Sequence, residues 1–172
     1  LAGPESSVSA QLRLKSWIET LKGYGLEPAS VIRGNWDAQS GYAGALQMLR
    51  ETAQFSAVLV ANDQMALGVL SAFHQHQISI PGEKSVIGYD DTYESSFFYP
   101  ALTTVSLDLD LQGKEAVRRI LNSGEDNALR MSSILPARLV MRQSTGPKGE
   151  KGKNLQVLAQ QLREIAHKIG DM

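Results

Sequence analysis

The sequence predicts an α/β fold built on a doubly wound parallel sheet, and three observations lead to this prediction. Short apolar runs of strand length alternate with longer amphipathic stretches of helix length. One of these runs, residues 57–61, is apolar throughout, which is typical of a parallel strand covered on both faces. Hydrophobic side chains make up 42% of the 172 residues, so a chain of this length can build its own core.

Helices are expected where apolar residues recur three and four positions apart. Residues 6–23 show this spacing, with a serine cluster that offers N-cap hydroxyls and Gly23 as a stop. Further segments have the same character: 39–52, 64–76 and 110–122. Because these stretches separate the apolar runs, they predict βαβ units with right-handed crossovers.

Strands are expected at the shorter apolar runs and at one extended stretch: residues 31–32, 57–61, 85–89, 102–105 and 134–141. In a doubly wound sheet, ligands bind at the carboxyl ends of the strands. Asn62 follows one run directly, and Asp90 and Asp91 follow another. The two adjacent carboxylates should point in different directions, so they are poorly placed for acid–base work on one bond.

Composition excludes several classes of function. The chain has no cysteine, which rules out a disulfide framework, a Cys-ligated zinc and a thiol nucleophile. Its 17 Lys and Arg against 18 Asp and Glu argue against a basic nucleic-acid-binding domain within these residues. No apolar run approaches the ~20 residues that span a bilayer. No phosphate loop, nucleophile elbow or metal-ligand spacing occurs, so we expect no cofactor, no metal and no enzymatic activity.

The remaining candidate residues suit the binding of a polyol. Arg13 offers a planar set of donors, Asn62 offers donors and acceptors, and Asp90 offers acceptors. Trp36 offers a flat face for the C–H side of a sugar ring, and Ser9 adds a hydroxyl near a helix start. Alone, each has an ordinary explanation: Arg13 on the surface, Trp36 in the core, Asp90 in a turn. Their combination at strand ends favours ligand binding.

The end of the chain has a different character. Residues 146–154 are rich in Gly and Lys and are expected to form a linker. Beyond it, apolar residues at spacings of three and four form a heptad seam: Leu155, Leu158, Leu162, Ile165 and Ile169. A single helix of this length is marginal in water. It therefore packs on its own domain or on another copy, and the linker favours self-association.

Several motifs resemble those of the lac/gal repressor family. They are AGP at residues 2–4 with SSVS at 6–9, VANDQMALG at 60–68, GYDDT at 88–92 and LTT at 102–104. The resemblance runs from Leu1 to about Thr145. It implies a cytoplasmic transcriptional repressor with a periplasmic-binding-protein-like core of two lobes, in which a galactoside-like inducer binds the cleft and lowers the affinity for operator DNA.

The resemblance also implies roles for individual residues. By motif position, five are similar to the inducer-contacting residues of the family: Ser9, Arg13, Trp36, Asn62 and Asp90. Leu107 and Leu109 stand in the pocket lining where the lac-type pattern has Gln and Phe, so the inducer or its affinity is expected to differ. Leu67 and Phe98 match the dimer interface, and the heptad tail matches a tetramerisation helix.

The same resemblance divides the chain into parts. Residues 1–108 would form the C-terminal lobe of the core, and residues 109–136 would belong to an N-terminal lobe that this chain lacks. Residues 137–145 would return to the C-terminal lobe, followed by the linker 146–154 and the tetramerisation helix 155–172. The headpiece that reads DNA would precede Leu1, and we expect the chain to be cut from something longer because its start, residues 1–4, lacks both an initiator Met and the charged-then-apolar order of a signal peptide.

Two other classes of protein stay open on the residues alone. A periplasmic sugar-binding receptor shares the fold, but such receptors usually work as monomers, so the heptad tail disfavours it. A small-molecule enzyme of flavodoxin-like architecture is the third possibility. No nucleophile–base pair in the sequence supports that enzyme.

Overall fold

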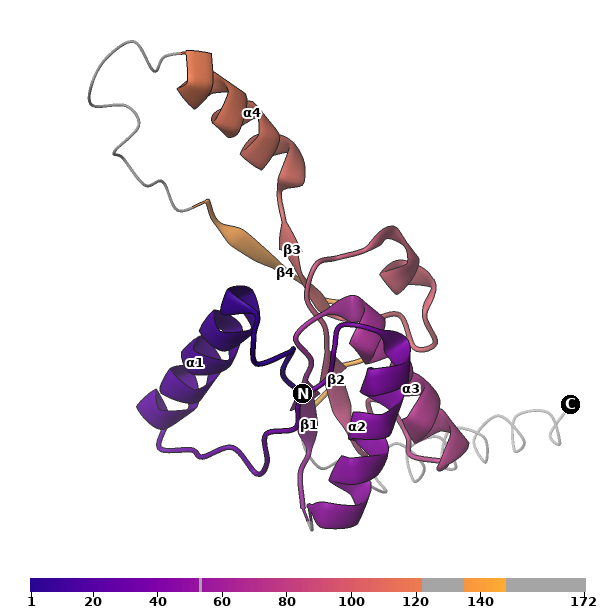
Figure 1. The fold of residues 1–172 in the computed structure, drawn as a ribbon. Coiled ribbons are helices and arrows are strands. Elements are labelled where there is room, and N and C mark those ends of the chain that lie inside the picture. Colours follow the sequence, from indigo (N-terminus) through magenta and orange to yellow (C-terminus); the bar gives the residue numbers. More distant parts are fainter. Residues whose placement is uncertain (53, 122–134, 148–172) are drawn as a thin grey trace, which may run out of the picture.

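The structure is a computed structural model that describes residues 1–52, 54–121 and 135–147 (Figure 1). Its elements follow in the order α1 (Val8–Gly23), α2 (Ala38–Glu51), β1 (Ala57–Leu59), α3 (Asp63–Gln75), β2 (Ser85–Ile87), the 3-10 helix η1 (Tyr93–Phe97), β3 (Thr104–Leu107), α4 (Leu109–Leu121) and β4 (Ala137–Val140). The predicted helices are confirmed within two residues at either end. The heptad tail lies outside the described residues.

The parallel sheet has β1 and β2 at its centre, paired from Ala57↔Ser85 to Leu59↔Ile87. Leu1 lies beside β1, where its amino group donates to Leu59 O (2.7 Å) and its carbonyl accepts from Ala61 N–H (2.9 Å). Single parallel bridges extend the sheet outward, Ala2 with Arg33 and Ile87 with Thr103. Helices α2 and α3 cover one side and α1 lies on the other, which confirms the doubly wound class (Figure 1).

One predicted strand is wrong. Residues 31–32 form no strand, because the sheet contact at this point is a single bridge at Arg33. Two backbone hydrogen bonds make this bridge. Ala2 N–H donates to Ile32 O and Gly34 N–H donates to Ala2 O, both at 2.8 Å.

The core lies between the sheet and the α2–α3 pair. Its large, fully buried apolar side chains come from α3, from β2 and from positions just outside β1 and β3: Phe73, Met65, Val69, Val86, Val60 and Leu102. Helix α1 contributes less, since Ala10 is its only buried residue and Val8 and Leu12 are exposed. The space between α1 and the sheet therefore has one firmly packed side, formed by the sheet and α3, and one lightly packed side, formed by α1.

Side-chain caps fix the starts of three helices. Ser7 Oγ accepts from Ala10 N–H at the start of α1, as the serine cluster predicted. Asp37 Oδ1 accepts from Ser40 N–H at the start of α2, and Asn62 Oδ1 accepts from Met65 N–H at the start of α3. The cap of α3 matters for function because Asn62 is also a predicted ligand residue.

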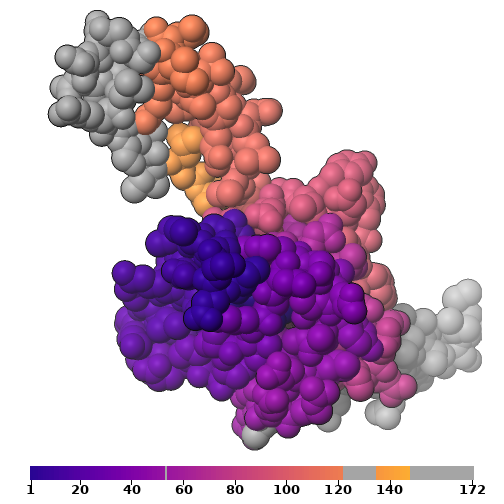
Figure 2. All heavy atoms as spheres, viewed as in Figure 1, coloured from indigo at the N-terminus to yellow at the C-terminus, as the bar shows by residue number. Residues whose placement is uncertain are grey.

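Strands β3 and β4 form an antiparallel ribbon, paired from Thr104↔Val140 to Leu107↔Ala137, that leads away from the lobe to α4 (Figures 1 and 2). Helix α4 buries none of its side chains, and its apolar residues Val117, Ile120 and Leu121 are exposed. Among the described residues no helix is long and apolar enough to cross a bilayer.

Candidate ligand-binding site

Arg13 is the centre of the polar cluster at the carboxyl edge of the sheet. From α1, its Nη1 donates to Ala61 O, two residues beyond the end of β1. Its guanidinium lies over the ring of Tyr89, with Cζ 3.7 Å from the ring centre, and 5.8 Å from the ring centre of Trp36. Ring faces at these distances attract a cation and fix the plane of its donors.

Asp90 faces Arg13 from the end of the next strand. Its Oδ1 lies 3.4 Å from Arg13 Nη2, and its backbone N–H donates to Val105 O at 2.9 Å. Burial raises the pKa of Asp90, the Arg13 charge opposes this rise, and the nearby Asp63 charge adds to it. The long contact leaves Arg13 and Asp90 only loosely paired, so both can still bond to an added hydroxyl.

Trp36 and Asn62 are brought together by one hydrogen bond. Asn62 Nδ2 donates to Trp36 O at 2.9 Å, while Asn62 Oδ1 accepts from Met65 N–H at the cap of α3. Both polar atoms of the buried Asn62 amide therefore have protein partners. The Trp36 ring packs against Gly3, where a Cβ atom would come within 2.4 Å of the ring. Asn62 thus holds Trp36 in place.

The other predicted ligand residues lie outside this cluster. Ser9 is exposed on α1, one helical turn before Arg13, and its hydroxyl lies 3.0 Å from Ser7 Oγ. Leu107 ends β3 half-buried, and Leu109 opens α4 with 68% of its surface exposed. Both leucines lie on the path that leads away from the lobe (Figure 1).

Tyr89 is a site residue that the sequence reasoning missed. It lies between the end of β2 and Asp90, and its ring supports the Arg13 guanidinium. The sequence signal that could have identified Tyr89 is its position directly before Asp90. An aromatic ring and a carboxylate that follow one another at a strand end can both reach the same cation.

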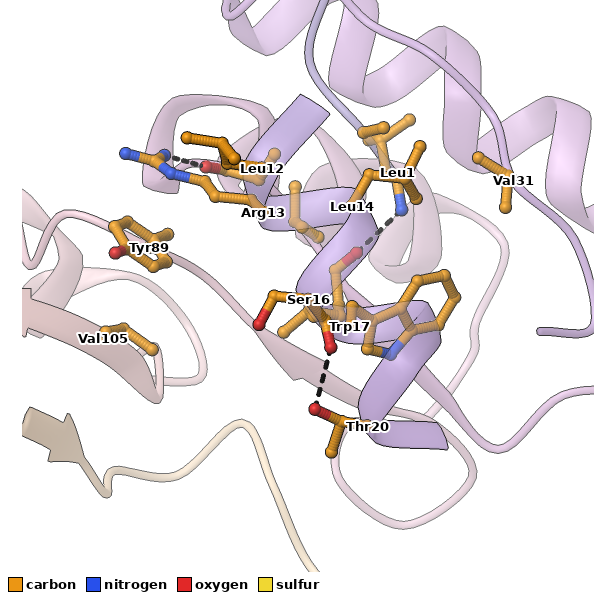
Figure 3. A pocket seen from close by; sticks show the side chains of 14 residues that line it. Leu1, Leu12, Arg13, Leu14, Ser16, Trp17, Thr20, Val31, Tyr89 and Val105 are labelled. Carbon is orange, nitrogen blue, oxygen red and sulfur yellow. Dashed lines mark hydrogen bonds between the residues drawn. The ribbon is translucent and has the colours of Figure 1, made fainter. Parts of the chain in front are cut away.

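A cavity of about 470 Å³ lies between α1 and the sheet (Figure 3). Arg13 and Tyr89 stand together at one side of it, and the rest of its lining is largely apolar and includes Leu1, Leu14 and Trp17. No carboxylate lines it. A polyol would find few partners there, so the polar cluster of Arg13 and Asp90, and not this cavity, is the candidate sugar site.

The predicted dimer residues differ from each other in exposure. Leu67 on α3 is 38% exposed, while Phe98 is half-buried and packs against the core. The aromatic residues around Phe98 are the exposed ones: Tyr93, Phe97 and Tyr99. The rings of Tyr93 and Phe97 contact each other, with centres 5.3 Å apart.

Residues 1–52, 54–121 and 135–147 contain no group of three or more His, Cys, Asp or Glu side chains that could hold a metal ion. The chemistry that the described site offers is a cation, a carboxylate and two ring faces. Groups of these kinds are able to form hydrogen bonds and stacking contacts with a neutral polar molecule.

The fold and the position of this polar cluster define the class, which is a lobe of the periplasmic-binding-protein type with polar side chains gathered at the carboxyl edge of the sheet. The model of the periplasmic binding protein-like domain matches residues 1–145. The chain belongs to that family, and within it the expected relationship to the lac/gal repressors is confirmed by the similarities that follow.

The chain is 46% identical over 169 residues to the lactose operon repressor of Klebsiella pneumoniae and 39% identical to that of Escherichia coli K12. These matches take in 98% of the chain and 48% and 47% of the two relatives, so it spans about half their length. A crystal structure of the lac repressor dimer bound to operator and the anti-inducer ONPF matches with a TM-score of 0.81 at 42% identity, over 85% of this chain and 51% of that one.

Proposed function

We propose that this chain is the inducer-binding and oligomerisation part of a lac-type transcriptional repressor, with a galactoside-like sugar as inducer. The observation that carries the proposal is the Arg13–Asp90 pair, held beside the rings of Tyr89 and Trp36 at the carboxyl edge of the sheet. Two relatives that match nearly the whole chain are named lactose operon repressors, which supports the same ligand class.

In this proposal Arg13 and Asp90 bond to sugar hydroxyls, and Trp36 offers its face to the ring. Asn62 acts by holding Trp36, because its amide donates to Trp36 O and accepts from Met65 N–H at the cap of α3. The ligand would be contacted by Ser9, Leu107 and Leu109 only when a second lobe closes over the carboxyl edge of the sheet. Since the side chains of Leu107 and Leu109 cannot donate or accept, they would shape the apolar side of the pocket and make the inducer, or the affinity for it, differ from the lactose-derived case.

The same proposal covers the parts of the protein that this chain lacks. Residues 109–136 would belong to the second lobe, which agrees with the exposed apolar face of α4. Residues 137–145 would return to this lobe. Operator DNA would be bound only through a headpiece outside this chain, in the cytoplasm. The inducer would favour the lobe arrangement that binds operator poorly, and a coupling of about 1–3 kcal/mol suffices for this.

The test is Arg13→Ala in the full-length repressor. Removing a charged donor set should weaken galactoside affinity roughly ten- to a hundred-fold, since bonds to charged groups contribute about 1.5–3 kcal/mol. Calorimetry measures the affinity, and an operator-binding assay with and without inducer measures the response. Operator binding without inducer should be unchanged.

The matched control is Arg50→Ala, because Arg50 is exposed in the last turn of α2. This variant should respond to inducer as the wild type does. A normal inducer response by Arg13→Ala would refute the assignment of the site. Loss of operator binding without inducer would instead indicate general damage to the fold, and thermal unfolding distinguishes this result from the expected one.

A further inference from the structure

An ion pair lies directly behind the candidate ligand site. Arg142 Nη2 donates to Asp91 Oδ1 at 2.6 Å, and the two side chains are 19% and 22% exposed. The preceding residue, Asp90, points the other way, towards Arg13. Charge-assisted bonds of this length are among the stronger hydrogen bonds in proteins. One turn therefore presents a carboxylate to the ligand site on one side and is tied to Arg142 on the other.

The backbone of this turn needs such support. Asp90 has φ 111° and Asp91 has φ 56°, both in the region that non-glycine residues rarely adopt. Backbone of this kind persists only where the surroundings hold it in place. Asp90 N–H donates to Val105 O at 2.9 Å, and Thr92 N–H donates to Asp63 Oδ2 at 2.9 Å. Arg142 adds the contact to the Asp91 side chain.

Arg142 is itself fixed on several sides. Its Nη1 donates to Leu102 O at 2.8 Å and to Ser95 Oγ at 3.2 Å. Its backbone N–H donates to Thr103 Oγ1 at 2.9 Å. The guanidinium fork suits this arrangement, because it presents its donors in one rigid plane towards several acceptors. A lysine could reach Asp91 but could not make the whole set of bonds.

Arg142 also stands at the base of the β3–β4 ribbon, two residues after β4 ends at Val140. The ribbon leads from the lobe towards α4 (Figure 1). The end of β4 and the turn that carries Asp90 are thus joined by one side chain.

We propose that Arg142 is a positioning residue, which through Asp91 holds Asp90 in the conformation that meets Arg13 and the ligand. It also ties this turn to the base of the β3–β4 ribbon. The ligand-binding part of this inference rests on the proposed function. The conformational part does not, because it concerns the Asp90 turn in the free protein.

The experiment uses Arg142→Met in the full-length repressor, which keeps an unbranched side chain but removes the donors. Amide hydrogen exchange is followed at Asp90 without ligand, and the affinity for the galactoside ONPG is measured by calorimetry. We expect the Asp90 amide to lose protection at least about ten-fold, while Val69 and Phe73 in the core of α3 keep theirs. The affinity for ONPG should fall by about the same factor.

Further variants make the result specific. Arg142→Lys keeps the charge and should recover part of both effects. Asp91→Asn removes the ion pair and leaves a residue that tolerates positive φ, so it should reproduce Arg142→Met. Arg50→Met makes the same substitution at an exposed position of α2 and should change neither quantity.

The outcomes separate the two proposals. Unchanged exchange at Asp90 in folded Arg142→Met overturns the positioning role. If that variant unfolds, Asp91→Asn decides in the same way. Weaker ONPG binding with no change at Asp90 also overturns it, because Arg142 would then act by another route. A wild-type protein that binds no galactoside contradicts the proposed function, and the exchange data still decide the role of Arg142.

Discussion

Leu1 places an amino group among apolar side chains and carbonyl oxygens. The group donates to Leu59 O at 2.7 Å, and burial lowers its pKa from 8.0 to about 5. A charged ammonium is poorly solvated there, so the folded state favours the neutral amine. The stability of a chain that carries a free amino group at Leu1 therefore depends on pH.

The sign follows from the two pKa values. Between pH 8 and pH 5 the unfolded amine takes up a proton that the folded amine does not bind, so acid favours unfolding. For the 172-residue chain with a free amino group at Leu1, we expect the free energy of unfolding to be highest above pH 8 and to fall by up to about 4 kcal/mol as the pH drops to about 5. Urea unfolding at constant ionic strength across this range measures the change.

Acetylation of Leu1 provides the control. The acetylated chain has no α-amine to titrate at Leu1, so the part of the slope due to Leu1 should disappear. Equal slopes for the free and acetylated chains would contradict the burial of a neutral amine.

The site residues differ in how far their sequence positions reveal their roles. Arg13 and Asp90 could be predicted to meet, because a strand end and a helix start converge at the carboxyl edge of a parallel sheet. The opposite directions of Asp90 and Asp91 are confirmed by their separate partners, Arg13 and Arg142. Arg142 could not be predicted, since its partner lies 51 positions away and no local pattern marks the pair.

At the scale of elements, α2 and α3 meet at their backbones. A Cβ atom on Gly68 would lie 2.0 Å from Ala38 O, and one on Gly41 would lie 2.1 Å from Met65 O. Glycine at these positions lets the helices approach without intervening side chains. The pair therefore forms the firm layer on which the sheet packs.

Gly68→Ala should destabilise the fold by about 1–3 kcal/mol, because the new methyl group meets backbone atoms that cannot move aside. Gly113→Ala is the matched control within α4, where nothing lies within 4 Å of the added atom. It should be neutral or stabilise the helix by about 0.5–1 kcal/mol. Thermal unfolding compares the two variants, and equal effects would contradict the backbone contact.

Helices were easier to predict than strands for a physical reason. Apolar spacing and a local cap such as Ser7 define a helix within its own segment. A strand depends on partners far along the chain. The prediction at residues 31–32 was wrong because the sheet contact there depends on Ala2, which pairs one position later, with Arg33. The strand predicted over 57–61 is observed at Ala57–Leu59, where the apolar run supplies the buried Val58 and, one residue beyond the strand, the buried Val60.

At the scale of the whole molecule, the described residues form one lobe and a ribbon that leaves it (Figure 2). The sequence predicted the parallel lobe, because that class follows from the alternation of elements. It also predicted a heptad tail whose structure lies outside the described residues. The tail therefore stays a prediction about assembly: dimers would form through the surface near Leu67 and Phe98, and the tail would join two dimers.

Deletion of residues 148–172 from the full-length repressor should convert a tetramer into a dimer, because it removes the seam that needs a partner. Light scattering after size exclusion measures the mass. Leu162→Asp, on the seam, should have the same effect, while Gln160→Asp, off the seam, should leave the tetramer intact. An unchanged mass after the deletion would contradict the role of the tail.

The place of Leu1 in the sheet has a consequence for biosynthesis. Leu1 and Ala2 lie between β1 and Arg33, and the amino group of Leu1 bonds 58 positions along the chain. During translation, the hydrogen bonds of Leu1 with Leu59 and Ala61 cannot form until residue 61 has emerged from the ribosome. Such non-local pairing slows folding, so the centre of the sheet can close only after the middle of the lobe has been made.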